Sequence, residues 1–317
     1  MMIDRHEEAS SSLSATRSPP LPFTLFDLRL HLGQRRLWVG PALASLCGAL
    51  ATGLMGLNSA SAVSLVLLLF LADPLLGAVW TFLAGPNALP RAGPAAADAP
   101  TLRIRALPYT LPGSLGDRTH RWLNRLASES GLAAVVSAIG GKVLFAAGVA
   151  VVLGPGVALV VAAAFVWVVF WTRVAGRPHS AGARAVYALG LPWLLGYATF
   201  LSGSLMPLAP QIPSSVPSFL SSAWILPALP AAAYTIVGWS LWREESPAAA
   251  NLIQLLLVAL LFARKEPFLA VIAAFALIFQ MALQPHRATR GHAWYLRHSQ
   301  WFLLLSMIAV ALGVTPG

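Results

Sequence analysis

The sequence predicts an all-α protein, a polytopic bundle of about nine membrane-spanning helices with the N-terminus inside and the C-terminus outside. Three observations lead to this prediction. The chain of 317 residues is 57% hydrophobic and only 10% charged, whereas soluble domains carry about 25% charged residues. Its apolar residues gather in nine runs that reach or approach the length of a membrane span. Its arginines lie mainly in every second gap between these runs, as in oriented multi-pass proteins.

The composition excludes several classes of protein. A mean hydropathy of +0.72 is too high for a soluble fold of this size, because burial is limited by the ratio of surface to volume. A cytosolic enzyme, a disordered chain and a secreted disulfide-rich domain are therefore excluded. The net charge of +10 does not indicate nucleic-acid binding, because the cations lie in short gaps between apolar runs. The single cysteine, Cys47, lies in an apolar run and is predicted to be a small buried residue.

Hydropathy divides the chain into two regions. Residues 1–36 form a polar N-terminal segment that lacks the apolar core and cleavage pattern of a signal peptide. Within this segment, residues 23–36 mix apolar and basic positions, which predicts a helix lying on the membrane surface. Residues 37–317 form the membrane domain.

Each apolar run of the membrane domain is predicted to be one helix, because about 20 helical residues cross a hydrocarbon layer of about 30 Å. Two connections contain residues that break helices. Gly-Pro-Gly at 154–156 predicts a tight hairpin, and a proline-rich loop without charge covers 207–218. The runs are 37–56, 61–85, 132–153, 155–172, 185–206, 220–242, 248–263, 267–284 and 299–315.

The arginines predict the orientation of the bundle. The inner segments hold five, six, three, one and three arginines in chain order, whereas the outer loops hold only Arg264 and Lys265. This asymmetry predicts a multi-pass protein of the inner (plasma) membrane. If runs seven and eight were re-entrant, the charged stretch 263–267 would lie elsewhere. The inner segments are 1–36, 86–131, 173–184, 243–247 and 285–298.

Two charged residues fall inside apolar runs, where a charge is costly and marks a candidate functional position. Lys142 lies about 18 Å from the outer turn at Gly154, at 1.5 Å per residue. Its side chain either snorkels inward or makes a functional contact. Asp73 precedes Pro74, which lacks a backbone donor and predicts a local kink in the helix. Asp73 is either a structural residue or a polar contact inside the bundle.

Motifs of soluble enzymes are absent from the sequence, and carboxylates are scarce. It contains no glycine-rich phosphate loop, paired-cysteine metal site or His-Glu-x-x-His motif. Magnesium–diphosphate chemistry needs clustered carboxylates, because Mg²⁺ prefers oxygen ligands. Glu244 and Glu245 form a pair, but neighbouring side chains on a helix point about 100° apart. They are weak candidates for metal ligands.

Four stretches resemble the UbiA-type intramembrane prenyltransferase superfamily. Residues 148–179 are similar to its third and fourth helices and the short basic loop that follows, and residues 190–207 to its fifth helix. Residues 223–246 resemble the sixth helix, and residues 279–313 the closing helices. Together with the long inner loop 86–131, this resemblance implies a nine-helix fold with an isoprenoid-sized central cavity.

The sequence departs from this family where the family carries its activity. The resemblance implies aspartate motifs after helices two and six, which bind magnesium and diphosphate. Here Trp80 and Thr81 stand near the first motif, and Asp73 lies about two turns too early. Only Glu244 and Glu245 stand at the second motif. Without a metal, the charge on a diphosphate leaving group is not stabilised, so the resemblance implies the fold without the activity.

Three hypotheses of function follow. The first, which we favour because the aspartate motifs are absent, is a catalytically degenerate protein. It would bind an isoprenoid lipid, a quinone or a chlorophyll-type tail, or act as a subunit of a membrane complex. The second is an active prenyltransferase with Mg²⁺ as cofactor and Asp73, Glu244 and Glu245 as catalytic candidates. The third is a transporter, in which Asp73 and Lys142 would line the path.

The candidate ligand-binding residues combine aromatic and cationic side chains. Trp80 lies at the end of the second run, and Arg118, Arg121 and Arg125 follow in an amphipathic part of the inner loop. Such arginines would bind an anion or anionic lipid. No cofactor is predicted unless the protein is an active enzyme, in which case Mg²⁺ is required. Membrane lipids are the predicted partners, and nucleic acid is not.

Overall fold

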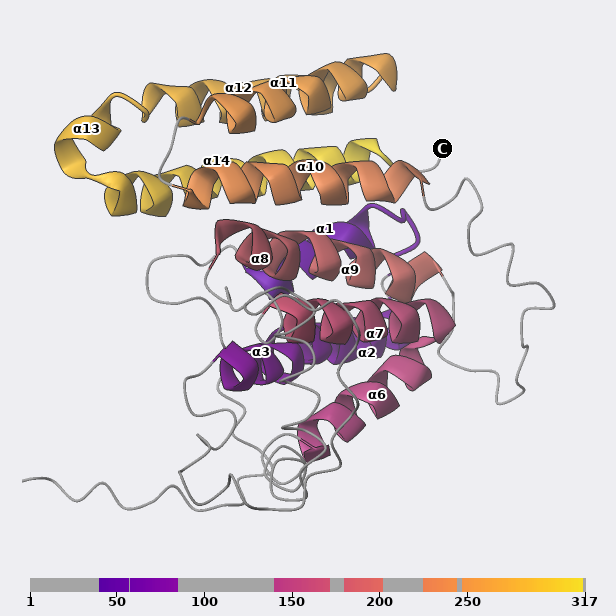
Figure 1. Cartoon of the computed structure of the whole chain (residues 1–317). Helices are drawn as coiled ribbons and strands as arrows, with labels where there is room; N and C mark the ends of the chain where they lie inside the picture. Colours follow the sequence, from indigo (N-terminus) through magenta and orange to yellow (C-terminus); the bar gives the residue numbers. More distant parts are fainter. Residues whose placement is uncertain are drawn as a thin grey trace, which may run out of the picture.

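The structure is a computed structural model, and all regular secondary structure in its described residues is helical (Figure 1). The all-α prediction is therefore confirmed. The described residues are 40–56, 58–84, 140–171, 180–201, 225–243 and 247–315. The predicted surface helix at 23–36, the inner loop 86–131 and the proline-rich loop 207–218 lie outside these ranges.

Each of the nine predicted runs overlaps a helix in the described part of the chain. Several runs contain more than one element, because π-helical segments interrupt two of the α-helices. The elements are α1 (Pro41–Leu50), α2 (Ser59–Phe70), η1 (Leu71–Leu75), α3 (Leu76–Ala84), α6 (Gly141–Leu153), α7 (Pro155–Val169), α8 (Ala181–Ala185), η5 (Val186–Gly190), α9 (Leu191–Leu201), α10 (Ile225–Trp242), α11 (Ala248–Ala263), α12 (Pro267–Ala282), α13 (His286–Arg290) and α14 (His292–Gly313).

Among the described residues, two helices are long and apolar enough to cross a membrane. They are the continuous helix Ser59–Trp80 and α14, each with 22 residues. Other apolar helices are shorter: α11 and α12 have 16 residues each, which extend about 24 Å against a hydrocarbon layer of about 30 Å. The number of spans and the orientation of the bundle stay predictions.

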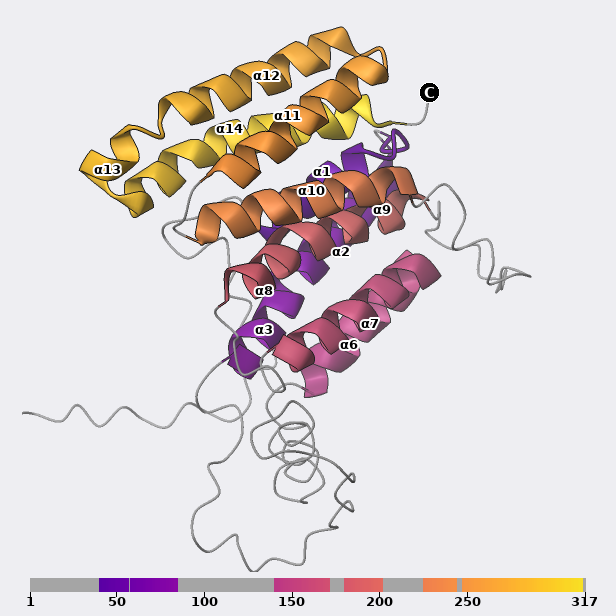
Figure 2. The same ribbon diagram turned by 45° about the horizontal axis from the view of Figure 1, so that its top comes forward.

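The helices are stacked in layers with similar axis directions (Figure 1). The hairpin of α11 and α12 packs on α10 and α14, which in turn pack on α1 and α9. Beyond this central pair lie α2, α3 and α7, and then α6, which packs on α7. Figure 2 shows α6 and α7 as a pair on the other side of α9 from the C-terminal helices, and α7 packs on α9.

The centre of the bundle depends on two glycines at the crossing of α1 and α9. A Cβ atom on Gly48 would collide with the backbone carbonyl of Trp193, and one on Gly196 would collide with the carbonyl of Ser45. The two backbones are therefore in contact, as at the small-residue interfaces of membrane helices. This crossing joins two hydrophobic cores, one formed mainly by the C-terminal helices and one around α2, α3, α6 and α7.

Two turns match the predicted connections. Gly154 ends α6 with a φ of 123°, and Pro155 begins α7, so the predicted Gly-Pro-Gly hairpin is confirmed. The turn between α11 and α12 contains Lys265 with a φ of 63°. Arg264 donates a 2.9 Å hydrogen bond to the carbonyl of Thr315, which places this turn beside the C-terminal end of α14.

The last helix begins earlier than predicted. The sequence placed residues 285–298 in an inner segment, but α13 and the first turns of α14 lie there. The reason is that Tyr295 and Ser299 are buried on one face of α14 while Arg297 and His298 are exposed on the other. A helix of this kind is amphipathic, and average hydropathy does not distinguish it from a polar loop. The predicted start at residue 299 is therefore wrong.

Candidate functional site

Two helices of the bundle contain a π-helical segment beside a proline. Pro74 lies inside η1, between α2 and α3, and Pro192 follows η5 at the start of α9. Proline lacks a backbone N–H, and a widened turn lets a helix continue past the missing hydrogen bond. The kink predicted at Pro74 is thus a π-helical turn within a continuous helix. Such turns are frequent at functional sites.

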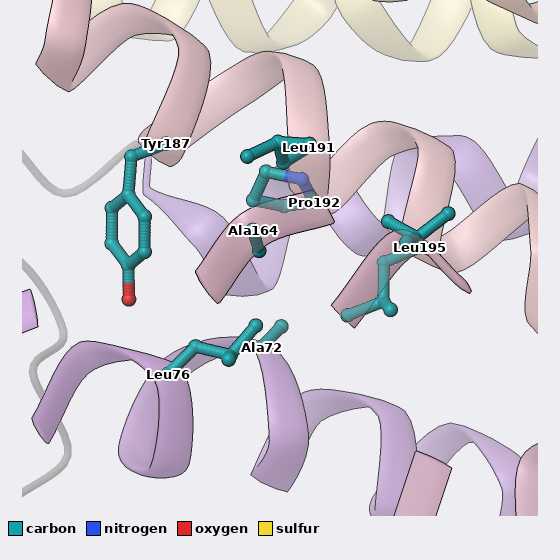
Figure 3. Close-up of a pocket in the computed structure, with 8 residues that line it drawn as sticks. Ala72, Leu76, Ala164, Tyr187, Leu191, Pro192 and Leu195 are labelled. Atoms are coloured by element: carbon teal, nitrogen blue, oxygen red, sulfur yellow. The ribbon is translucent and has the colours of Figure 1, made fainter. Parts of the chain in front are cut away.

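A cavity lies between these two helices and α7 (Figure 3). Its empty space of about 230 Å³ includes the part that is open to solvent, and the enclosed part holds only about one water molecule. This is smaller than the isoprenoid-sized cavity that the family resemblance implies. The lining side chains are apolar except for one hydroxyl. They are Ala72, Leu76, Val160, Ala164, Tyr187, Leu191, Pro192 and Leu195.

The polar group of the cavity is the hydroxyl of Tyr187, which η5 contributes. The side chain is only 8% exposed, and its hydroxyl is buried with no hydrogen-bond partner among the described residues. In Figure 3 the ring points away from η5 toward the helix that carries Leu76. An unsatisfied buried hydroxyl costs about 1–3 kcal/mol. This donor is therefore available to a molecule that enters the cavity.

Asp73 lies next to the cavity without lining it. The residue is 2% exposed, and both carboxylate oxygens are buried. It interacts electrostatically with Tyr187 across the interface between the two interrupted helices. Both alternatives for Asp73, a structural residue and a polar contact inside the bundle, stay predictions.

Trp80 lies one and a half turns beyond η1 and packs on the same tyrosine. Its indole stacks on the ring of Tyr187 with the ring centroids 4.6 Å apart and an interplanar angle of 24°. Stacked aromatic pairs contribute about 0.5–1.5 kcal/mol beyond the burial of their area. Two of the residues selected from the sequence, Asp73 and Trp80, are thus brought together by a residue that was not selected.

The other candidates are not brought to this cavity by the described residues. Lys142 lies in the first turn of α6, is half-buried, and does not line the cavity. The carboxylates Glu244 and Glu245 lie outside the described residues, as do the three arginines of the inner loop, Arg118, Arg121 and Arg125. Within the described ranges, no group of three or more His, Cys, Asp or Glu side chains could hold a metal ion.

Sequence reasoning also missed a buried polar contact between α11 and α12. Gln254 donates a 3.1 Å hydrogen bond to Oε1 of Gln280, and both side chains are at most 1% exposed. One turn away, Gln284 donates a 2.9 Å hydrogen bond to Oδ1 of Asn251. Amide pairs of this kind hold membrane helices together. The signal in the sequence was the spacing of side-chain amides within apolar runs. Asn251 and Gln254 are three residues apart, and Gln280 and Gln284 are four residues apart.

Comparisons of the chain with protein-family models, with curated proteins and with solved structures return no match. The resemblance to the UbiA-type superfamily therefore stays a prediction, and the candidate site is interpreted from its own geometry.

Proposed function

We propose that this chain is a multi-pass protein of an energy-conserving or plasma membrane that binds an isoprenoid quinone without transforming it. The observation that carries the proposal is the buried Tyr187 hydroxyl at the cavity between the two π-helical segments. A phenol hydroxyl donates a hydrogen bond, and a quinone carbonyl accepts one. Binding would therefore remove the cost of leaving this donor unpaired.

The size of the cavity favours a small flat head group over a whole lipid. The enclosed part holds only about one water molecule, so a flat ring would enter as the lining side chains move apart, and the isoprenoid tail would extend along apolar helix faces into the lipid. The ring of Tyr187 is kept in place by Trp80 on one side. Because stacking limits rotation of the ring, the C–O bond of Tyr187 points in one direction. The hydroxyl would therefore orient the bound head group.

The carboxyl group next to the cavity favours a neutral ligand over a diphosphate. Asp73 is buried beside Tyr187, and in its ionised form it would repel a diphosphate strongly where the dielectric constant is low. A prenyltransferase overcomes such repulsion with magnesium, and the described residues provide no cluster of metal ligands. The same site tolerates a quinone, which carries no charge in its oxidised form.

Mass spectrometry of lipids that co-purify with the protein in mild detergent tests the proposal. We expect a quinone with the parent protein and much less with Tyr187→Phe, which keeps the ring and removes the donor. The matched control is Tyr234→Phe, because the hydroxyl of Tyr234 already bonds to that of Ser306 at 3.0 Å, away from the cavity. Equal amounts of quinone in all three proteins, or none in the parent, would contradict the proposal.

A further inference from the structure

The corner between α13 and α14 brings a tryptophan and an arginine together. Gly291 has a φ of 84°, in the left-handed region that glycine adopts readily. Its N–H donates a 3.0 Å hydrogen bond to the carbonyl of Arg287. This turn folds α13 back toward α14, so that the guanidinium carbon of Arg290 lies 4.8 Å from the centre of the Trp294 ring.

Trp294 is held by histidines as well. His298, one turn further along α14, stacks on the indole with ring centroids 4.2 Å apart and an interplanar angle of 30°. Its Nδ1 donates a 2.8 Å hydrogen bond to the carbonyl of Trp294, which fixes the imidazole. The ring of His286 lies 5.9 Å from that of Trp294. The indole is thus the centre of a basic cluster, here called the Trp294 cluster: His286, Arg287, Arg290, Trp294, Arg297 and His298.

The segment that carries this cluster contributes only positive charge. No Asp or Glu occurs between residue 267 and the end of the chain at 317. Arg290 and Arg297 are exposed, as are His286 and His298. Because these groups point outward from a half-buried indole, the cluster presents a positively charged surface with an apolar centre.

The cluster also lies where a membrane surface would be. It occupies the start of α14, which is one of the two helices in the described part of the chain that are long and apolar enough to cross a membrane. Indole rings prefer the boundary between hydrocarbon and head groups. A second pair, Arg243 over Trp239 at 5.1 Å, lies at the end of α10, which Figure 1 shows at the same end of the bundle as α13.

We infer that the Trp294 cluster binds the phosphate head group of an anionic phospholipid. The indole inserts among the acyl chains, and Arg287, Arg290 and Arg297 surround the phosphate with donors. This site is separate from the cavity at Tyr187 and does not depend on the proposed quinone. It is also separate from the inner-loop arginines, which lie in another part of the sequence.

Lipid-dependent thermal stability of the full-length protein tests this inference. The purified protein is titrated with phosphatidylglycerol, and with phosphatidylcholine of the same acyl chains. We expect saturable stabilisation with the anionic lipid only. Replacing Arg287, Arg290 and Arg297 by Gln should weaken the apparent affinity about a hundredfold, or about fivefold per arginine. The single variant Arg290→Gln, at an exposed position, should weaken the apparent affinity about fivefold.

The matched control is Arg264→Gln with Lys265→Gln, because these cations lie at the opposite end of the bundle. This variant should bind phosphatidylglycerol as the parent does. Trp294→Leu should weaken binding even though it leaves every charge in place. Retention of parental affinity by the triple variant would overturn the inference. An equal loss in the Arg264/Lys265 control would also overturn it, since net charge alone would then explain the binding.

Discussion

The rings of Tyr187 and Trp80 stack with their centroids 4.6 Å apart and thereby connect the helix that contains η5 with the helix that contains η1. Tyr187 lines the cavity between these helices, and Asp73 of η1 is buried nearby and interacts electrostatically with it. A residue outside every recognised motif is therefore the one that organises the candidate site.

Tyr187→Phe should leave the stability of the protein unchanged or raise it by up to about 1–3 kcal/mol, because it removes a buried hydroxyl that lacks a partner among the described residues. Tyr234→Phe should lower stability by about 0.5–1.5 kcal/mol, because it leaves the Ser306 hydroxyl unpaired. Thermal unfolding of both variants in detergent, without added lipid, measures the difference. The opposite order of stabilities would show that the Tyr187 hydroxyl is satisfied within the protein.

Gly48→Ala should destabilise the protein strongly, because the new methyl group would collide with the carbonyl of Trp193 and push α1 away from α9. Overpacking typically costs about 1–3 kcal/mol. Gly148→Ala is the control: this glycine lies in α6 with no atom within 4 Å of the added Cβ. It should stabilise the helix by about 0.5–1 kcal/mol. Similar melting temperatures for the two variants would contradict the close crossing.

The orientation can be tested at two exposed positions on either side of α12: Glu266, directly before it, and Thr289 in α13, which follows it. A cysteine at Thr289 should react with a membrane-impermeant maleimide only in inverted vesicles, and one at Glu266 only in intact cells. Cys47 should give little background, because it is 1% exposed. If the cysteine at Glu266 is labelled from the same side as that at Thr289, the hairpin of α11 and α12 does not cross the membrane.

Magnesium together with a non-hydrolysable prenyl diphosphate should not raise the thermal stability of the protein. A ligand that binds only the folded state stabilises it by RT ln(1 + [L]/Kd), and the described residues contain no group of three or more His, Cys, Asp or Glu that could hold a metal ion. A magnesium-dependent increase in Tm that disappears in Glu245→Gln would contradict the non-catalytic interpretation and support the prenyltransferase.

Much of the fold could be predicted from the sequence, because apolar runs and helix breakers report local structure. The hairpin at Gly154 and the helices on either side of it follow from composition alone. The start of α14 did not, because Tyr295 and Ser299 are buried by contacts with other helices. The π-helical segment at Pro74 was predicted only as a kink, since its form depends on hydrogen bonds along the whole helix.

Less of the candidate site could be predicted. Asp73 and Trp80 were selected because a charge and an indole in an apolar run are conspicuous in one dimension. Tyr187 was missed because a tyrosine in such a run is common, and its importance comes from meeting Trp80 and Asp73 across the bundle. The crossing of Gly48 with Gly196 was missed for the same reason.

Calorimetric titration of the purified protein with a short-chain quinone tests whether the cavity at Tyr187 is a quinone site. We expect saturable binding at one site per chain. Tyr187→Phe should weaken the affinity by about threefold to tenfold, the equivalent of one hydrogen bond, while Tyr234→Phe should bind as the parent does. Absence of saturable binding, or equal affinity of the parent and Tyr187→Phe, would contradict the assignment of the cavity as a quinone site.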